Sequence, residues 1–171
     1  MSGEEARDTR TLYLTARIGL VRVVLQRVSR AAVSVGGEVV SEIGQGLCLL
    51  VGIEPEDSVG DVAAAVDKIL GLRVFGDETG KMNLSIGDVD GEILVVSQFT
   101  LLGDVRKGRR PSFTRAAPPD HAEPLVLAMA EAFDRVGIET RTGVFGARMS
   151  VDMTNDGPVT LVLEISDGRV Q

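Results

Sequence analysis

Hydrophobic and polar residues alternate along several short stretches of the chain, which is the pattern of half-buried β-strands. Alternation over residues 21–28 predicts one such strand. Within residues 31–43, two β-rich runs meet at Gly36 and Gly37, and this pair predicts a hairpin because glycine readily adopts positive φ. The unbroken apolar run over residues 46–53 predicts a strand at the centre of a sheet.

Two stretches have the spacing of amphipathic helices. In the first, Ser58 and Asp61 stand in capping-box spacing. Its apolar positions recur at helical intervals, at Val59, Val62, Val66 and Ile69. The second is predicted to begin near Asp120 and to end at Gly137. Its apolar stripe consists of Leu125, Met129, Phe133 and Val136.

The remaining elements complete a sheet. A buried strand is predicted over residues 91–100, after a turn-rich loop over 75–83. Three further strands are predicted at 138–143, 148–155 and 158–166. Strands and helices do not alternate strictly, so we expect an α/β fold with one mixed, barrel-like β-sheet and two or three packed helices in a single domain.

The two ends of the chain differ from the middle. Residues 1–20 include Glu4, Glu5 and Asp8 and lack the apolar core of a signal peptide. We expect them to be a disordered extension or a start assigned too early, followed by a domain over 21–166 and a tail over 167–171. No apolar run approaches the length of a membrane span. We therefore expect a cytoplasmic protein that does not associate with membranes.

Cysteine and histidine are scarce, which limits the chemistry of the chain. Cys48 is the single cysteine, so an internal disulfide is excluded, and its apolar surroundings favour a buried, inert thiol over a nucleophile. The single histidine, His121, follows Asp120 at a helix start, where a solvated side chain is favoured over a catalytic one. No metal site and no cofactor are expected.

Positive charge is concentrated in one loop, although the net charge of the chain is −7. Between Asp104 and residue 115 the loop carries Arg106, Lys107, Arg109, Arg110 and Arg115. One interpretation is surface charge that keeps an edge soluble. The favoured interpretation is anion binding, because arginine and lysine on a loop after a strand end are suited to contact phosphates.

Three motifs together make the chain recognisable. These are SQFTL at 97–101, KGRRPSF at 107–113 and NDGPVT at 155–160, and together they resemble the D-aminoacyl-tRNA deacylase family. The segments VLQRVSRAAV and GEILVVSQFTL extend the resemblance, which covers residues 21 to about 164. From its composition alone, NDGPVT would be only a turn followed by a proline at a strand edge or strand start.

The resemblance implies roles for particular residues. It places the aminoacyl pocket at Ser97, Gln98, Phe99 and Thr100. It implies that Gly157 and Pro158 are joined by a cis peptide and are inserted into the active site of the partner subunit of a homodimer. Met149 and Ala122 match positions that line the pocket, and Arg27 matches an arginine that holds the Gly-Pro loop.

The implied activity is hydrolysis of the ester bond of D-aminoacyl-tRNA, and also of mischarged glycyl-tRNA, with release of free tRNA and the amino acid. The enzyme would proofread chirality by rejecting L-aminoacyl-tRNA, because a rigid wall can exclude the L side chain. Phosphates of the tRNA acceptor end would meet Arg106, Lys107, Arg109 and Arg110.

The residues favour one mechanism over another. Neither SQFTL nor NDGPVT contains a histidine, lysine or glutamate that could act as the base for Thr100. Positioning of the ester and oxyanion stabilisation by backbone N–H groups around Phe99 and Thr100 are therefore favoured. In that mechanism the vicinal ribose hydroxyl of the substrate assists the attacking water. The alternative is that Thr100 is a covalent nucleophile.

Two other functions compete with this prediction. The first is a non-catalytic RNA-binding module that uses the basic loop over 106–115, although the chain has few aromatic residues for base stacking. The second is an aminopeptidase or amidase that acts on free D-aminoacyl compounds. A deacylation assay with D-aminoacyl-tRNA distinguishes the first from a tRNA deacylase. Comparison of charged tRNA with a D-aminoacyl ester of a simple alcohol distinguishes the second.

Overall fold

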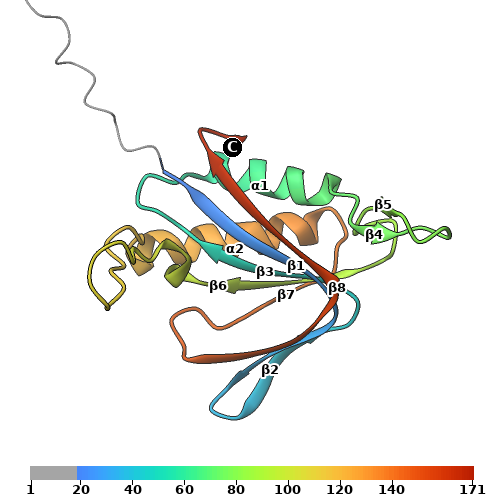
Figure 1. Cartoon of the computed structure of the whole chain (residues 1–171), viewed down its shortest axis with the longest axis horizontal. Coiled ribbons are helices and arrows are strands. Elements are labelled where there is room, and N and C mark those ends of the chain that lie inside the picture. The colour runs from blue at the N-terminus through green and yellow to red at the C-terminus, as the bar shows by residue number, and fades with distance from the viewer. Residues whose placement is uncertain (1–18) are drawn as a thin grey trace, which may run out of the picture.

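A seven-stranded mixed β-sheet is the framework of the protein (Figure 1). The computed structural model describes residues 19–171, so the expectation for residues 1–20 lies outside the described residues except at its last two positions. The strands of this sheet are β1 (Val21–Val35), β2 (Glu38–Ile43), β3 (Gly46–Gly52), β6 (Glu92–Ser97), β7 (Thr140–Thr142), β8 (Met149–Ser166) and β9 (Arg169–Val170). Their order is β7-β6-β3-β1-β8-β9, with β2 also paired to β1. The β3–β6 and β6–β7 pairs are parallel, and the other pairs are antiparallel.

Two helices cover one face of the sheet. α1 (Val59–Gly71) and α2 (Pro119–Arg135) share a core with β1, β3, β6 and β8. β1 and β8 bend together, so that β2 and the first half of β8 curl below the rest of the sheet (Figure 1). A second apolar cluster, which includes Cys48, fills this curl. The predicted single-domain α/β fold with a mixed, barrel-like sheet is therefore confirmed.

Local sequence signals explain several of these elements. Gly36 and Gly37 turn the β1–β2 hairpin with φ values of +60° and +88°. At the start of α1, the Ser58 N–H donates to the Asp61 carboxylate at 2.9 Å, and the Asp61 N–H donates to the Ser58 hydroxyl, which completes the capping box. β3 lies between β1 and β6, as its continuous apolar run predicts. The hairpin, the capping box and the central strand are thus confirmed.

Cys48 is fully buried on β3. Burial raises the pKa of its thiol to about 12, because the thiolate would lose its hydration. The thiol therefore stays protonated at neutral pH, which confirms the buried, unreactive cysteine. Within residues 19–171, no helix is long and apolar enough to cross a membrane.

The two long strands differ from the prediction. The predicted strand over 21–28 continues without a break into the hairpin as β1, and the two predicted strands over 148–155 and 158–166 are one strand, β8. Gln26 pairs with Thr160 and Val28 with Asn155, so four residues of β8, 156–159, face one residue of β1. The turn residues of NDGP thus form a bulge inside a strand, because the continuous partner strand carries the pairing across it.

Shorter segments also differ. The loop predicted over 75–83 contains two short paired strands, β4 (Phe75–Gly76) and β5 (Met82–Leu84). The strand predicted over 91–100 ends at Ser97 and is followed by a 3₁₀-helix, Phe99–Leu102. Val136 is 58% exposed beyond the end of α2 and does not belong to its buried stripe. Residues 167–171, expected as a tail, contribute β9 and a hydrogen bond from the Gly168 N–H to the Asp61 carboxylate.

Candidate active site

A cavity of about 400 Å³ lies where β3 and β6 end and α2 begins. This volume is in the range of sites that bind small molecules. Its walls are predominantly apolar and come from β3, the turn after β6, α2 and two loops. The lining residues are Val51, Ile53, Ser97, Gln98, Phe99, Phe113, Ala116, Ala117, Pro119, Ala122, Val126, Phe145 and Gly146.

The turn after β6 is positioned by its neighbour β3. The two strands pair in parallel up to Val51 and Ser97, and the next N–H, of Gln98, donates to the Val51 carbonyl at 2.7 Å. The chain then leaves the sheet as the 3₁₀-helix. Gly52 permits this close approach, because a Cβ at this position would lie 3.3 Å from the Gln98 carbonyl oxygen. Phe99 consequently projects from the strand end and is 57% exposed.

Two backbone donors are free at this turn. Within the described part of the chain, the N–H groups of Phe99 and Thr100 donate to no protein acceptor. The first residues of a helix generally leave such donors without a partner inside the helix. The two N–H groups are therefore available to an oxygen that enters the site.

Thr100 is exposed in the 3₁₀-helix beside Gln98. Its hydroxyl oxygen accepts a hydrogen bond from the Gln98 side-chain amide. An amide N–H cannot take a proton from a hydroxyl, so this contact does not activate Thr100 as a nucleophile. His121 does not reach it either, because the His121 Nε2 atom lies 2.9 Å from the Asp57 carbonyl oxygen.

Two aromatic residues of the cavity were missed in the sequence. The Phe113 ring meets the Phe99 ring edge to face, with centroids 5.2 Å apart and planes at 78°. Phe145 lines the cavity from the loop between β7 and β8. The sequence could have indicated both residues, because each is an aromatic residue in a polar, glycine-containing loop. Such a residue needs a partner to bury its ring.

Other predicted residues gather at the same site. Ala122, in the first turns of α2, lines the cavity, and its small side chain leaves space open. Met149, at the start of β8, lines an adjoining cavity of about 190 Å³ together with Ser97, Gln98 and Phe99. The structure thus brings together the SQF segment, Ala122 and Met149.

Arg27, Gly157 and Pro158 lie elsewhere in the subunit. The Gly157-Pro158 peptide is cis, as the resemblance implies, and both residues are exposed in the bulge of β8. The Arg27 guanidinium donates to the carbonyls of Asp156 and Val74, at 3.1 and 2.5 Å. It also forms an ion pair with the Asp156 carboxylate at 3.3 Å. Arg27 therefore fixes the start of the bulge.

The bulge is far from the cavity along the sheet. Arg27, which faces the bulge, pairs with Leu47 of β3, and Leu47 pairs with Ile93 of β6. Ile93 precedes Ser97 by four residues, which corresponds to about 13 Å along the strand. Three strand spacings, from β8 to β6, add about 14 Å across the sheet. The Gly-Pro bulge therefore does not reach the cavity of its own subunit.

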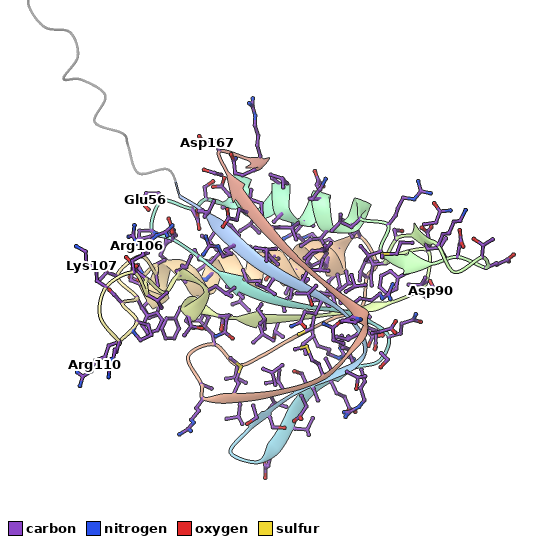
Figure 2. The ribbon with its side chains drawn as sticks, viewed as in Figure 1. Glu56, Asp90, Arg106, Lys107, Arg110 and Asp167 are labelled. Atoms are coloured by element: carbon purple, nitrogen blue, oxygen red, sulfur yellow. The ribbon has the colours of Figure 1, made fainter. Side chains whose placement is uncertain are left out.

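The basic loop projects from the end of the molecule near the cavity. Its neck is closed by two hydrogen bonds between the backbones of Asp104 and Ser112, at 2.7 and 2.9 Å. Figure 2 shows Arg106, Lys107 and Arg110 at this end, with their side chains directed away from the sheet. Lys107, Arg109 and Arg110 are exposed and form no ion pair among residues 19–171.

Two arginines of the basic segment are already paired. The Arg106 guanidinium donates to both oxygens of the Asp104 carboxylate, at 2.9 and 2.6 Å, and holds the pKa of that carboxyl well below its usual range. Arg115 forms an ion pair with the buried carboxylate of Glu54. The free positive charge of the loop is therefore smaller than the sequence suggests.

Acidic residues are buried in the turn that connects β3 to α1. Glu54 and Asp57 are each 2% exposed, and the Glu54 N–H donates to the Asp57 carboxylate at 2.6 Å. Burial, followed by repulsion from Asp61 and Glu54, raises the pKa of the Asp57 carboxyl to about 7. His121 caps this turn through its contact with Asp57, so it is half-buried and not the solvated residue expected from the sequence. Among residues 19–171, no three His, Cys, Asp or Glu side chains are arranged to hold a metal ion.

The family model described as "D-Tyr-tRNA(Tyr) deacylase" matches residues 24–164. A D-aminoacyl-tRNA deacylase of Geobacillus sp. (strain WCH70) is 59% identical over 144 residues, which cover 84% of this chain and 95% of that protein. The corresponding protein of Thermus aquaticus is 55% identical over 147 residues, covering 86% and 97% of the two chains.

Two solved structures share the fold. That of a c-Myc DNA unwinding element binding protein is 46% identical in sequence, with a TM-score of 0.78 over 83% of this chain and 97% of that one. That of a "probable eukaryotic D-amino acid tRNA deacylase" is 20% identical, with a TM-score of 0.74 over 85% and 100%. The second likeness concerns the fold alone.

The raised pKa of Asp57 predicts how stability depends on pH. Between pH 4 and 7 the folded protein holds a proton on Asp57 that the unfolded chain releases, so the free energy of unfolding should fall as pH rises through this window. Asp57→Asn keeps an acceptor for the Glu54 N–H without a charge. In the Asp57→Asn variant, the decrease in the free energy of unfolding with pH should be smaller by on the order of 2–4 kcal/mol. At pH 8 the variant should be more stable than the unmodified protein.

Urea unfolding at fixed protein concentration from pH 4.5 to 8 measures this effect. Asp67→Asn, which removes an exposed carboxylate from α1, controls for the loss of one negative charge. Parallel pH profiles for Asp57→Asn and the unmodified protein would contradict the prediction.

Proposed function

Because the chain belongs to the D-Tyr-tRNA(Tyr) deacylase family and is a D-aminoacyl-tRNA deacylase, we propose that it hydrolyses the aminoacyl ester at the cavity beside Phe99. The observation that carries this proposal is that two backbone N–H groups without an acceptor among residues 19–171, those of Phe99 and Thr100, lie in the same turn as Gln98 and Phe99, which line an apolar cavity. The cavity receives the aminoacyl group, and the N–H groups face its ester carbonyl. The products are free tRNA and the amino acid, and the enzyme works in the cytoplasm.

The chemistry requires little from the side chains. Water attacks the ester carbonyl carbon, and the carbonyl oxygen becomes an oxyanion that accepts hydrogen bonds from the N–H groups of Phe99 and Thr100. The bond to the ribose oxygen then breaks, and that oxygen takes a proton as the tRNA leaves. The Gln98 side-chain amide donates a hydrogen bond to the Thr100 hydroxyl and cannot act as its base, so Thr100 is not activated. The vicinal ribose hydroxyl of the substrate therefore assists the attacking water.

Chirality is selected by exclusion. The D and L forms of one amino acid differ only in the direction of the side chain, so apolar contact in the cavity discriminates weakly between them. A wall of backbone atoms excludes the L side chain whatever its identity. Glycine has no side chain to exclude, so mischarged glycyl-tRNA is also a substrate. Gly157 and Pro158 form this wall.

The wall comes from a second subunit. The bulge that carries Gly157 and Pro158 is exposed and fixed by Arg27, and it lies at the opposite end of the sheet from the cavity of its own chain. These features support a homodimer in which each bulge enters the partner's cavity. In a symmetric dimer both sites are equivalent, because the same surfaces meet twice.

The tRNA acceptor end lies along the basic loop. Lys107, Arg109 and Arg110 are exposed beside the cavity and are suited to contact phosphates without reading the sequence. Arg106 contributes less, because its charge is balanced by Asp104. The rest of the acidic chain repels phosphate, so binding is confined to this end of the molecule.

The first test measures deacylation with D-Tyr-tRNA, L-Tyr-tRNA and Gly-tRNA. The unmodified protein should hydrolyse the D-tyrosyl and glycyl esters and spare the L-tyrosyl ester. Ala122→Phe, which places a ring in the cavity, should lower the rate on D-Tyr-tRNA by about 100-fold or more, since small displacements of the ester are costly.

Ala63→Phe on the exposed side of α1 is the matched control and should retain the rate. Binding of tRNA without hydrolysis would favour the RNA-binding module. Equal efficiency on charged tRNA and on the D-tyrosyl ester of a simple alcohol would favour a hydrolase that acts on free D-aminoacyl compounds.

A second test concerns Thr100. Thr100→Ala should keep the deacylation rate within roughly tenfold of the unmodified protein, because the hydroxyl has no base to make it a nucleophile. Rapid quenching during turnover, followed by mass spectrometry of the protein, checks the alternative. Capture of an aminoacyl ester on Thr100 would refute the proposed attack by water.

Mixed dimers test whether the wall is contributed by the partner. One chain carries Ala122→Phe in the cavity, and the other carries Gly157→Val, which is strained because Gly157 has φ of +124°. Each variant alone should be inactive on D-Tyr-tRNA or should lose D-over-L selectivity. In the mixed dimer, the unmodified cavity of one chain meets the unmodified bulge of the other, so about half of the activity should return. No recovery, or full activity in a monomer, would contradict the shared site.

A further inference from the structure

Glu54 is a buried carboxylate next to the cavity wall. Its side chain is 3% exposed, and it follows Ile53, which lines the cavity. The backbone around it is fixed, because the Glu54 carbonyl accepts from the Asp57 N–H at 3.2 Å while its own N–H donates to the Asp57 carboxylate. A charge in this position is costly unless an opposite charge is held close to it.

Arg115 supplies that opposite charge from a distant part of the chain. Its guanidinium forms an ion pair with the Glu54 carboxylate, and its side chain is 35% exposed. Arg115 lies between Phe113 on one side and Ala116 and Ala117 on the other, all of which line the cavity. Its own side chain does not line the cavity. The ion pair therefore fixes this wall on its side away from the cavity.

The same segment is attached to the sheet and to the basic loop. The Ala117 N–H donates to the Ile53 carbonyl at 2.9 Å, directly before Glu54. At the other end, Ser112 closes the neck of the loop through its two hydrogen bonds with Asp104, and the next ring, of Phe113, packs against Phe99. The wall thus connects the phosphate-facing loop to the turn that carries the backbone donors.

We propose that Arg115 is a positioning residue of the deacylase, which uses its ion pair with Glu54 to hold residues 113–117 as a wall of the aminoacyl cavity. It is not a phosphate ligand, although it belongs to the same cationic segment as Lys107, Arg109 and Arg110. The proposal rests on the proposed function only in taking this cavity as the reaction site. Its structural consequence is independent of activity.

Arg115→Ala and Glu54→Gln each release the wall from one side. Each should lower kcat on D-Tyr-tRNA by about tenfold or more, with KM and its salt dependence unchanged. The same loss should appear with the D-tyrosyl ester of adenosine, which keeps the vicinal ribose hydroxyl but has no phosphates. The double variant Glu54→Gln/Arg115→Gln, which removes both charges and can form an amide–amide hydrogen bond, should recover much of kcat.

Arg110→Ala is the matched control, since it removes one exposed arginine of the same loop. It should raise KM for charged tRNA, lower the slope of log affinity against log salt by about 0.7–0.9, and leave hydrolysis of the phosphate-free adenosine ester unchanged. If Arg115→Ala instead behaves as Arg110→Ala, Arg115 is a phosphate ligand and the proposal is wrong.

Hydrogen exchange separates a failure of this proposal from a failure of the proposed function. The Ala117 amide should exchange faster in Arg115→Ala and Glu54→Gln, at the unmodified rate in Arg110→Ala, and more slowly again in the double variant. Unchanged exchange in all variants would overturn the positioning role even if the protein showed no deacylase activity. If Arg115→Ala does not fold, Glu54→Gln and the double variant Glu54→Gln/Arg115→Gln are compared in the same measurements, and equal exchange of the Ala117 amide in these two would also overturn the proposal.

Discussion

The parallel pairing of β6 with β3 fixes the turn at which we propose that hydrolysis takes place. Pairing ends at Ser97 and Val51, and the hydrogen bond from the Gln98 N–H to Val51 is the last one that belongs to the sheet. Beyond it the chain turns as a 3₁₀-helix, whose first N–H groups have no backbone acceptor among residues 19–171. In the proposed mechanism, the donors for the oxyanion thus arise from the end of a strand, and their geometry depends on backbone that the sheet holds rigid.

The cations of the basic segment have two different roles, depending on whether they form an ion pair. The segment after the 3₁₀-helix carries five cations, but Asp104 and Glu54 engage Arg106 and Arg115 within the fold. One pair braces the neck of the loop, and the other lies behind the cavity wall. Three exposed cations, Lys107, Arg109 and Arg110, form no ion pair within residues 19–171, on a protein whose net charge is −7. An anionic polymer is consequently attracted at one end and repelled elsewhere, which favours a defined orientation over non-specific coating.

The sequence predicted local features well and long-range ones poorly. The capping box at Ser58 and the apolar run of β3 depend on neighbouring residues, so periodicity was sufficient to predict them. The NDGP turn was interpreted as a break between strands, because nothing local reveals that β1 runs unbroken beside it. The motif resemblance indicated Ser97 to Phe99, Ala122 and Met149, which the fold gathers together. It could not indicate the contact of Phe113 with Phe99 or the Glu54–Arg115 pair, since these contacts depend on how the loop folds back on the sheet.

The bulge and the cavity are held at a fixed separation by the strands that join them. Because Arg27 secures the bulge while β3 secures the turn after β6, a bend large enough to bring Gly157 to Phe99 within one chain would break the β1–β3 and β3–β6 pairing. A rigid, exposed element that cannot reach its own site is suited to a partner's site, where it needs no rearrangement to bind. In the proposed dimer, the chiral wall is therefore preorganised before substrate arrives, and selectivity depends on assembly of the two subunits.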